Sequence, residues 1–395
     1  MDYDVYLGDV VDESFSQYAG AVIQSRALVD VRDCIKPSAR QIYYCMYTDN
    51  FVHDKPFKKT LKAIGSAMRT YIHGDSSCEG IIMRSGQPFS LRYPLIEVEG
   101  SYGNQTETGN WAASRYTSSR LSALANYLLQ DTDRYSIQEW VDNYDDTEQY
   151  PRVLSSLGFY NIVNGSMGIG VGLASSIPQF NLKEVNDAMI KLLRDSTVSD
   201  DEIVCYPDWA TGCTLINAKV VLESLKAGKG KAAIVRATMH YDKKDNCIVV
   251  TELPYSVYSN TICEELEKMV SKDPTCGIIN VNDLTGSTVN IKIYLDKGIN
   301  PDVIMNKLYA ETSLQKSISI NLTMLENGRF PRIFTWREAL TAHLEHEKHT
   351  YINYYNYELE KKEKRLNIVN GLLLAIAQID KVVKIVRSAT STDDA

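Results

Sequence analysis

The chain has 395 residues, of which 44% are hydrophobic and 23% are charged, and this predicts two or three folded domains rather than extended disorder. A net charge of −8 over the whole chain does not favour binding of a partner that carries phosphate. Because the chain has no stretch of about eighteen apolar residues and begins Met1-Asp2-Tyr3-Asp4, we expect a cytoplasmic protein without a membrane span or secretory leader.

The charge is unevenly distributed along the chain. Residues 1–20 hold five acids and no base, and residues 126–395 hold 29 Lys and Arg against 36 Asp and Glu. Residues 21–125 reverse the balance, with 13 Lys and Arg against 9 Asp and Glu. Their cations include Lys55, Lys58, Lys59, Lys62, Arg69, Arg84, Arg92, Arg115 and Arg120. We interpret this segment as a local patch for a phosphate backbone, although a solvated helix face explains the lysines equally well.

The first predicted elements are two helices. Residues 14–27 and 36–47 carry apolar residues at helical spacing. Pro37 suits the first position of the second helix, because the N–H that proline lacks has no intrahelical partner there.

A helix-turn-helix outline follows. Residues 58–72 predict a helix that ends at His73-Gly74. Asp75-Ser76-Ser77 then offers N-cap side chains for a second helix that runs through Arg84. The second helix of such a pair presents its N-terminal turn to DNA. Two ordinary packed helices would give the same pattern.

Arg115 and Tyr116 form the most informative dipeptide of the chain. A tyrosyl oxygen can attack phosphorus and hold it as an ester, so that a broken strand is resealed without outside energy. The adjacent guanidinium would offset charge that grows on the phosphoryl oxygens. The chain has 25 tyrosines, so this pair carries weight only through its surroundings.

Beyond residue 150 the pattern becomes mixed. Residues 231–238, 247–252 and 288–295 predict strands, and residues 336–387 predict a long helix. In that helix apolar residues recur at heptad positions, namely Leu359, Leu366 and Leu373 with Val369, Ile376 and Val383 between them. A coiled-coil arm needs such a seam, whereas a solvated helix does not.

Several motifs do not predict a ligand site. Gly168-Ile169-Gly170-Val171-Gly172 lacks the dinucleotide-binding spacing and indicates close backbone packing. Gly228-Lys229-Gly230-Lys231 lacks the Ser or Thr of a phosphate loop. His343, His346 and His349 share a helix face, where we expect a solvated surface rather than metal ligands. The eight cysteines contain no Cys-x-x-Cys pair and favour small, mostly buried side chains over a disulfide framework.

A series of motifs carries a family resemblance. In order, these are Arg26 to Pro37, His73-Gly74-Asp75-Ser76, Gln87 to Tyr93, Ala113 to Thr117, Val141 to Asp145, Val163 to Gly172, Glu252-Leu253-Pro254-Tyr255, and Leu372 to Arg387. The series resembles the breakage-reunion subunit of type IIA DNA topoisomerases, the group of gyrase A and the topoisomerase IV C subunit. The short acidic N-terminus is most similar to the bacteriophage members, which would place the protein in the cytoplasm of a bacterial host.

The resemblance implies an α+β multidomain fold. Its parts are an acidic N-terminal segment over 1–20, a winged-helix cleavage domain over 21–150, a mixed α/β tower domain over 151–330, and a coiled-coil arm over 331–395. The arm leads to a dimer gate in the family, and here we expect it to stop before the returning helix. The C-terminal wrapping domain of gyrase is not expected, which argues against negative supercoiling.

The resemblance also implies roles for individual residues. Tyr116 falls on the cleavage tyrosine, Arg115 on its neighbouring arginine, and Arg26 on an arginine that reaches the scissile phosphate. The expected DNA-binding residues are Lys36, Arg40, Lys62, His73, Ser76 and Arg84. The chain has no Asp-x-Asp cluster of the family's type, so we expect no metal site in it. Mg2+ and ATP would be bound by a partner subunit.

The sequence departs from the family at several positions. Ala39 replaces a histidine, Gln41 an arginine and Tyr71 the first histidine of a His-Pro-His motif, so the site relies more on His73 and Arg26. At Gly80 the acid of the bacterial quinolone site is missing, so drug response is not carried over. The apolar wedge that the family inserts into DNA aligns near Gly158, flanked by Leu157 and Phe159.

The resulting hypothesis is the DNA-cleaving subunit of an ATP-dependent type II topoisomerase. Its partners would be double-stranded DNA, a second copy of the chain and an ATPase subunit, with no membrane. One alternative is a non-enzymatic helix-turn-helix protein with a dimerising arm, which would bind DNA without a covalent link. A second is a tyrosine recombinase, but its tyrosine lies near the C-terminus, and Tyr116 comes too early for that.

Overall fold

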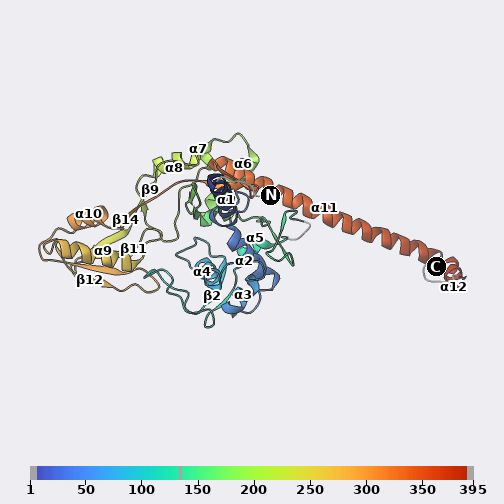
Figure 1. Cartoon of the computed structure of the whole chain (residues 1–395), viewed down its shortest axis with the longest axis horizontal. Coiled ribbons are helices and arrows are strands. Elements are labelled where there is room, and N and C mark those ends of the chain that lie inside the picture. The colour runs from blue at the N-terminus through green and yellow to red at the C-terminus, as the bar shows by residue number, and fades with distance from the viewer. Residues whose placement is uncertain (1–6, 133–135, 389–395) are drawn as a thin grey trace.

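The computed structural model describes residues 7–132 and 136–388. The described residues form an α+β fold, as predicted, and this fold has twelve α-helices and several small antiparallel sheets. Figure 1 shows a central body, an extension that carries the largest sheet, and one long helix that projects from the opposite side of the body. No helix among the described residues is long and apolar enough to cross a membrane. The outer ends of the expected 1–20 segment and of the 331–395 arm lie outside these residues.

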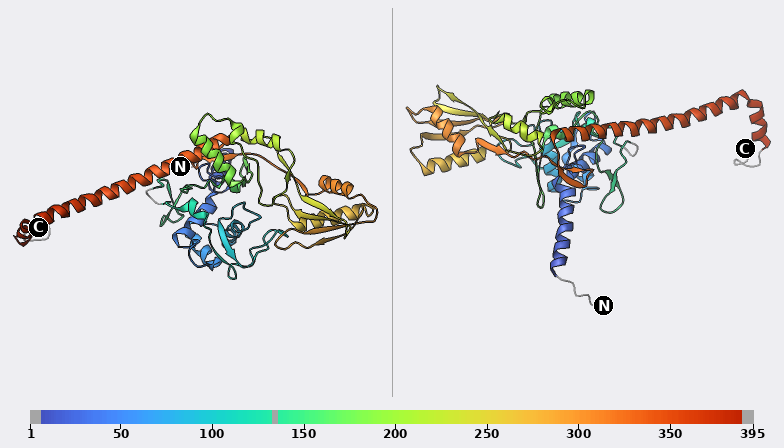
Figure 2. Two further views of the ribbon diagram at one scale, coloured as in Figure 1. Left: turned by 180° about the vertical axis from the view of Figure 1, so that it is seen from behind. Right: turned by 90° about the horizontal axis from the view of Figure 1, so that it is seen from above.

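The N-terminal helix α1 (Leu7–Val22) stands away from the body, and none of its residues is buried. Figure 2 shows it leaving the body at a steep angle to the long helix. It continues into the π-helix η1 (Ile23–Ala27), where Ala27 reaches the core. The helix predicted over 14–27 is therefore confirmed, and it begins earlier than predicted.

Three helices and a small sheet build the first part of the body. They are α2 (Pro37–Thr48), α3 (Thr60–Ala67) and α4 (Asp75–Ser85), with β1 (Lys58–Lys59), β3 (Ser118–Leu121) and β2 (Ile96–Glu99) in the sheet order β1-β3-β2. Pro37 occupies the start of α2 as predicted. The prediction of one helix over 58–72 is wrong at both ends, because residues 58 and 59 pair with β3 and the helix ends at residue 67. The predicted side-chain cap of α4 is also wrong, since Gly74 is the N-cap and no side chain caps it.

A hairpin then brings the glycine-rich motif against η1. The elements after β3 are α5 (Ala125–Leu129), β4 (Trp140–Asp142), β5 (Gln149–Pro151), the 3-10 helix η2 (Asn161–Asn164), β6 (Ser166–Ile169) and β7 (Ala174–Ile177). A Cβ on Gly168 would lie 1.9 Å from the carbonyl oxygen of Ala27, a distance that no side chain tolerates. Close backbone packing, the prediction for this motif, is confirmed.

The extension has a hydrophobic core of its own. Its sheet has the order β10-β11-β13-β12, and helices α9 and α10 accompany it. The bounds are β10 (Thr238–Asp242), β11 (Cys247–Glu252), β12 (Ile278–Asp283), β13 (Ile291–Leu295), α9 (Ser259–Lys272) and α10 (Pro301–Glu311). The strand predicted over 247–252 is confirmed, and the one predicted over 288–295 begins three residues late.

The remaining elements connect the extension to the body. They are α6 (Leu182–Arg194), α7 (Asp200–Ile203), β8 (Thr214–Leu215), α8 (Ala218–Lys226), β9 (Ala233–Arg236), β14 (Gln315–Ile318), β15 (Thr323–Glu326) and β16 (Phe330–Ile333). Strand β9 lies within the predicted range 231–238 and pairs between β14 and β8.

The long helix α11 (Trp336–Ala377) is followed by α12 (Ile379–Ser388), which confirms the helical prediction for 336–387 with a break at Gln378. A capping box starts α11, in which the side chains of Thr335 and Glu338 each bond to the backbone of the other residue. The first turns pack on the body, and the Nε1 of Trp336 donates to the carbonyl of Ile203 at 2.7 Å. The buried residues of α11 all lie between positions 336 and 350, so the rest of the helix projects.

Candidate functional site

Tyr116 stands exposed on a turn that leads into β3. Its side chain is 66% exposed, and its backbone N–H donates to the carbonyl of Ala113 at 2.9 Å, which closes the turn. The guanidinium carbon of Arg115 lies 4.9 Å from the centre of the Tyr116 ring. The structure therefore keeps together the hydroxyl and the cation that adjoin in the sequence, and both face solvent.

The turn is attached to the N-terminal end of α3. The backbone N–H groups of Leu61 and Thr60 donate to the carbonyls of Ser114 and Thr117 at 3.2 and 3.1 Å. The hydroxyl of Thr117 donates to that of Thr60 at 2.9 Å, and both side chains are buried. Tyr116 is thus held on the first helix of the helix-turn-helix outline.

A second group of side chains, around Tyr71, follows the C-terminal end of α3. The ring of buried Tyr71 meets the ring of His73 edge-on, with the centroids 5.2 Å apart. Burial raises the pKa of Tyr71, while the positive charge of Arg26 acts to lower it. His73 is therefore a neighbour of a buried tyrosine, and the charge of Arg26 acts on the same side chain.

The two groups are separated by the helix between them. Helix α3 has eight residues, which corresponds to about 12 Å. Among the described residues, no hydrogen bond or ring contact joins Tyr116 to Arg26. The described residues of one chain therefore show no direct contact between Arg26 and Tyr116.

Lys36 and Arg84 both line a cavity of about 400 Å³, where the Nζ of Lys36 donates to the carbonyl of Met167. Burial lowers the pKa of Lys36 and the charge of Arg84 lowers it further. The lining contains hydroxyls from Ser38, Ser90 and Ser166 and, over the described residues, no carboxylate. Such a lining has the chemistry of an anion site.

The other expected DNA contacts divide into exposed and buried residues. Lys62 and Ser76 are exposed, as a contact with DNA requires. Arg40 is buried, with Nε and Nη2 donating to the Asp33 carboxylate at 2.7 and 2.9 Å and Nη2 also donating to the carbonyl of Ile35. The Arg40 guanidinium is therefore used inside the fold in this structure, and its expected contact with the DNA backbone stays a prediction.

The expected wedge position is corrected. Leu157 and Phe159 are buried, and Gly158 between them has a φ of +76° and no side chain to insert. Among the large hydrophobic side chains of the described residues, Ile169 at the end of β6 is the most exposed, at 89%. The signal in the sequence was an isoleucine between two glycines, because such a residue at a hairpin tip has few neighbours to cover it.

The histidine motif does not form a solvated surface, contrary to the prediction. His343 is buried, stacks on Tyr160 at 4.1 Å, and donates from Nδ1 to the carbonyl of Arg32 at 2.7 Å. His346 donates from Nε2 to the carbonyl of Leu154 at 2.7 Å, whereas His349 is exposed. Burial lowers the pKa of His343 to about 3, so the ring is neutral. These two histidines attach α11 to the body.

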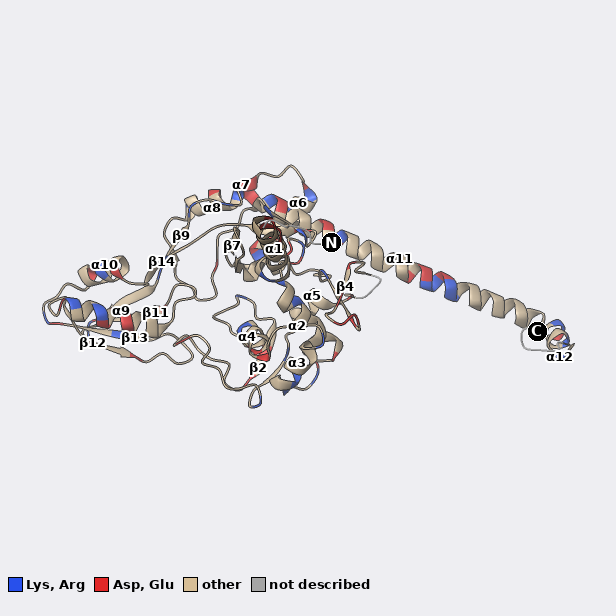
Figure 3. Ribbon diagram, viewed as in Figure 1, with Lys and Arg blue, Asp and Glu red and all other residues tan. Residues whose placement is uncertain are grey.

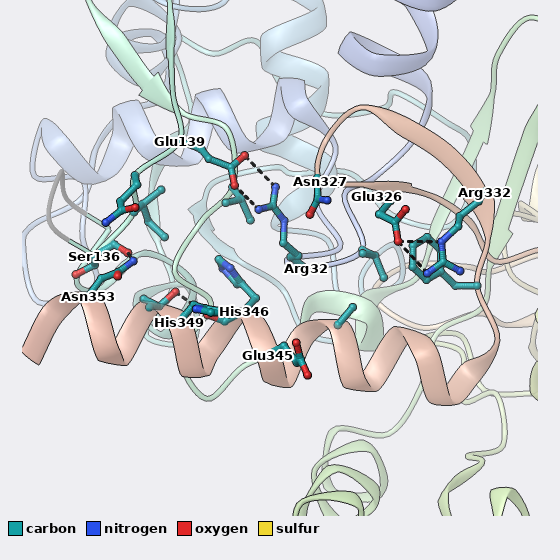
Figure 4. A pocket seen from close by; sticks show the side chains of 17 residues that line it. Arg32, Ser136, Glu139, Glu326, Asn327, Arg332, Glu345, His346, His349 and Asn353 are labelled. Atoms are coloured by element: carbon teal, nitrogen blue, oxygen red, sulfur yellow. Dashed lines mark hydrogen bonds and ion pairs between the residues drawn. The ribbon is translucent and has the colours of Figure 1, made fainter. Parts of the chain in front are cut away.

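A cavity of about 470 Å³ lies beside these histidines at the base of α11. Figure 4 shows Arg32 and Glu139 joined directly to each other in its lining, while His346 and His349 come from α11. The two arginines of the lining are already paired, Arg32 with Glu139 and Arg332 with Glu326. We therefore do not assign a ligand to this cavity.

The cysteines and acidic groups of the described residues suggest no further site. All eight cysteines are free, six of them buried, in agreement with the sequence prediction. Asp242, Asp245 and Cys247 bring their ligand atoms within 4.8 Å of one another on the β10–β11 hairpin. Asp245, however, is paired with Lys292 at 2.7 Å, so its carboxylate already has a cation.

Comparison with known proteins gives a consistent result. Residues 26–395 match the family of the DNA gyrase/topoisomerase IV A subunits. The DNA gyrase A subunit of Thermotoga maritima is 35% identical over 394 residues, which cover 98% of this chain and 49% of the relative. The DNA gyrase A subunit of Mycoplasma pneumoniae is 34% identical over 395 residues, covering 98% and 47%. The DNA topoisomerase 4 A subunit of Staphylococcus aureus is 35% identical over 400 residues, covering 99% and 50%. The chain spans about half the length of these relatives.

Proposed function

The chain belongs to the family of DNA gyrase/topoisomerase IV A subunits, and from this we propose that it is the DNA-cleaving and rejoining subunit of an ATP-dependent type II DNA topoisomerase. Each of two copies attacks one strand through Tyr116. The tyrosyl oxygen bonds to phosphorus as the bond to the 3′ oxygen breaks, and the departing oxygen takes a proton. The 5′-phosphotyrosyl ester keeps the energy of the broken bond, so the 3′ hydroxyl can reverse the step. The observation that carries this proposal is an exposed tyrosine, beside an arginine, on a turn fixed to α3.

The proposed DNA surface combines the helix-turn-helix and the cationic cavity. Helices α2, α3 and α4 with the sheet β1-β3-β2 are interpreted as a winged-helix unit within residues 21–150, followed by a tower over 151–330 and an arm from 331. Lys36 and Arg84 hold a backbone phosphate between them, because they are adjacent cations with no carboxylate partner among the described residues. Lys62, His73 and Ser76 add contacts along the same strand.

The position of Arg26 favours a site shared between two copies. Because no contact among the described residues joins Arg26 to Tyr116 of the same chain, Arg26 and His73 are proposed to serve the phosphate that Tyr116 of the second copy attacks. The guanidinium then stabilises the charge on a phosphoryl group bound from the other side.

Ile169 is proposed as the apolar wedge that unstacks a base step and bends the DNA. Its exposure at a hairpin tip has no role in the packing of this chain. Ile169→Ala should reduce the bend of an end-labelled duplex, measured by energy transfer between the two ends, while Ile190→Ala on α6 should not. An unchanged bend in the Ile169 variant would refute this role.

Mg2+ does not fit among the residues that the structure places around Tyr116. The side chains that the structure places in contact with Tyr116 are cationic, Arg115 and Lys59, and the Lys36 cavity has no carboxylate in its described lining. This donor set repels a divalent cation. We therefore propose that Mg2+ and ATP are both bound by the partner subunit.

The test is the capture of the covalent intermediate. The chain is mixed with the ATPase subunit, Mg2+ and supercoiled plasmid, the mixture is denatured with detergent, and protein-linked linear DNA is measured. Tyr116→Phe should abolish the adduct because it removes the attacking oxygen. The control Tyr144→Phe, at another exposed tyrosine, should retain it. DNA binding without any adduct in the wild type would favour the non-enzymatic helix-turn-helix protein instead.

A further inference from the structure

The two lysines of β1 hold two different parts of the fold. The Nζ of Lys59 donates to the backbone carbonyl of Tyr116 at 3.2 Å. The Nζ of Lys58 donates to the carbonyl of Asp49 at 2.9 Å and lies 4.2 Å from the centre of the Phe51 ring. The side chains of neighbouring strand residues point to opposite faces, so one lysine reaches the Tyr116 turn and the other points toward α2.

Lys59 makes the one side-chain bond to the backbone of Tyr116 itself among the described residues. The other bonds that hold the turn are made by the backbone N–H of Tyr116 to the carbonyl of Ala113, and by Ser114 and Thr117 on either side of the tyrosine. Lys59 is exposed and, over the part of the chain that the structure describes, pairs with no carboxylate. Its charge is therefore available to strengthen the bond to the carbonyl, and a charged donor makes a stronger hydrogen bond than a neutral one.

We infer that Lys59 is a positioning residue for Tyr116, an inference that rests on the proposed function. Through its bond to the Tyr116 carbonyl, the Lys59 ammonium fixes the orientation of the peptide group that follows Tyr116. This limits the directions in which the phenol side chain can point. Attack on phosphorus requires the oxygen in line with the leaving group, so a fixed backbone raises the fraction of productive encounters. The same ammonium places a second cation, after Arg115, beside the nucleophile and its phosphate.

The experiment compares Lys59→Met with the matched variant Lys58→Met. Both changes remove one positive charge from the same short strand, but only the first removes the bond to Tyr116. Single-turnover cleavage is measured at saturating DNA in the presence of Mg2+ and the ATPase subunit, while DNA affinity is measured separately. We expect Lys59→Met to slow cleavage roughly tenfold, the loss of one charge-assisted hydrogen bond, without a greater loss of affinity than Lys58→Met. Lys59→Arg should restore most of the rate.

A second readout requires no partner subunit. Amide hydrogen exchange over residues 113–117 should become faster in Lys59→Met and stay unchanged in Lys58→Met, because the turn loses a bond only in the first. Equal cleavage rates in the two methionine variants, or equal exchange, would overturn the role of Lys59. Absence of any adduct in the wild type would instead overturn the proposed function, and the exchange experiment would still decide whether Lys59 fixes the turn.

Discussion

Arg40 and Asp33 form a buried ion pair that the sequence did not indicate. Arg40 follows the family motif that contacts DNA, yet the Asp33 carboxylate binds it in the core and also accepts the backbone N–H groups of Ile35 and Leu154. Aspartate and arginine seven positions apart give no periodic signal, so only the fold reveals the pair.

The buried pair predicts a loss of stability in Arg40→Met. The variant should lower the free energy of unfolding by about 3 to 5 kcal/mol, because it leaves the Asp33 carboxylate buried without its cation. Lys62→Met, at an exposed residue, should change it by less than about 0.5 kcal/mol. Urea denaturation of both variants gives the comparison. Equal stability would show that Arg40 leaves the core in solution.

The contact between Lys59 and Tyr116 illustrates what sequence reasoning could not supply at this scale. Arg115 and Tyr116 are adjacent, so their pairing is visible in the sequence, whereas Lys59 is 57 positions away from Tyr116. The antiparallel pairing of Lys59 with Ser118 brings the two segments together. A strand of two residues has no alternation to recognise, so this register could not be predicted.

Among the elements, long periodic segments were predictable and short ones were not. The helix over 336–387 and the strand over 247–252 were found because each carries many residues of one pattern. The ends of α3 were misplaced because tertiary pairing with β3 takes residues 58 and 59 out of the helix. The face of α11 that holds His343 was misread as solvated, since the neighbour that covers it, Tyr160, is distant in the sequence.

The attachment of α11 predicts a dependence of stability on pH. The pKa of His343 is about 3 in the folded chain and about 6.5 when unfolded. Between these pH values the unfolded state therefore binds more protons than the folded state. The contribution of His343 to the free energy of unfolding is complete above pH 6.5 and is lost as the pH falls toward 3, by at most about 1.4 kcal/mol per pH unit. Burial also lowers the pKa of His346, which adds to the effect. Glu347, whose pKa is raised, opposes this loss of stability at low pH, because its own contribution to the free energy of unfolding falls as the pH rises.

His343→Phe isolates this contribution. The variant keeps a ring on Tyr160 but cannot take up a proton, so its free energy of unfolding should fall less steeply than that of the wild type between pH 6.5 and 5. His349→Phe, at an exposed histidine of the same helix, should keep the wild-type slope. Denaturation series at several pH values measure both slopes. Parallel slopes in wild type and His343→Phe would contradict the assignment of a buried neutral histidine.

The molecule as a whole leaves a long apolar seam without a partner inside the described part of the chain. Leu366 and Leu373 are 57% and 59% exposed, and Leu359 and Ile376 are exposed on the same helix. Figure 3 shows charged residues concentrated in the middle of α11 and on α12, with an uncharged stretch between them. A second copy that lays its own arm along this seam would cover these side chains, as in a coiled coil.

The seam predicts self-association through the arm. Replacement of both Leu366 and Leu373 by glutamate should shift the protein toward monomer, because it places charges in the interface. Lys361→Gln with Lys364→Gln changes the net charge by the same amount but leaves the seam intact, and should keep the wild-type mass. Sedimentation equilibrium separates the two cases. An unchanged mass in the leucine variant would exclude the arm as the main dimer contact.

The projecting part of α11 also multiplies angular motion. From residue 351 to residue 377 the helix runs about 40 Å beyond its last buried contact. A tilt of roughly 10° at the histidine attachment would therefore displace its far end by about 7 Å, more than one helical turn. Two arms tilting in opposite senses would separate their ends by twice that distance. Shifts of less than an ångström around Arg32 and Leu154, where α11 attaches to the body, would thus produce a large separation of the far ends of the two arms.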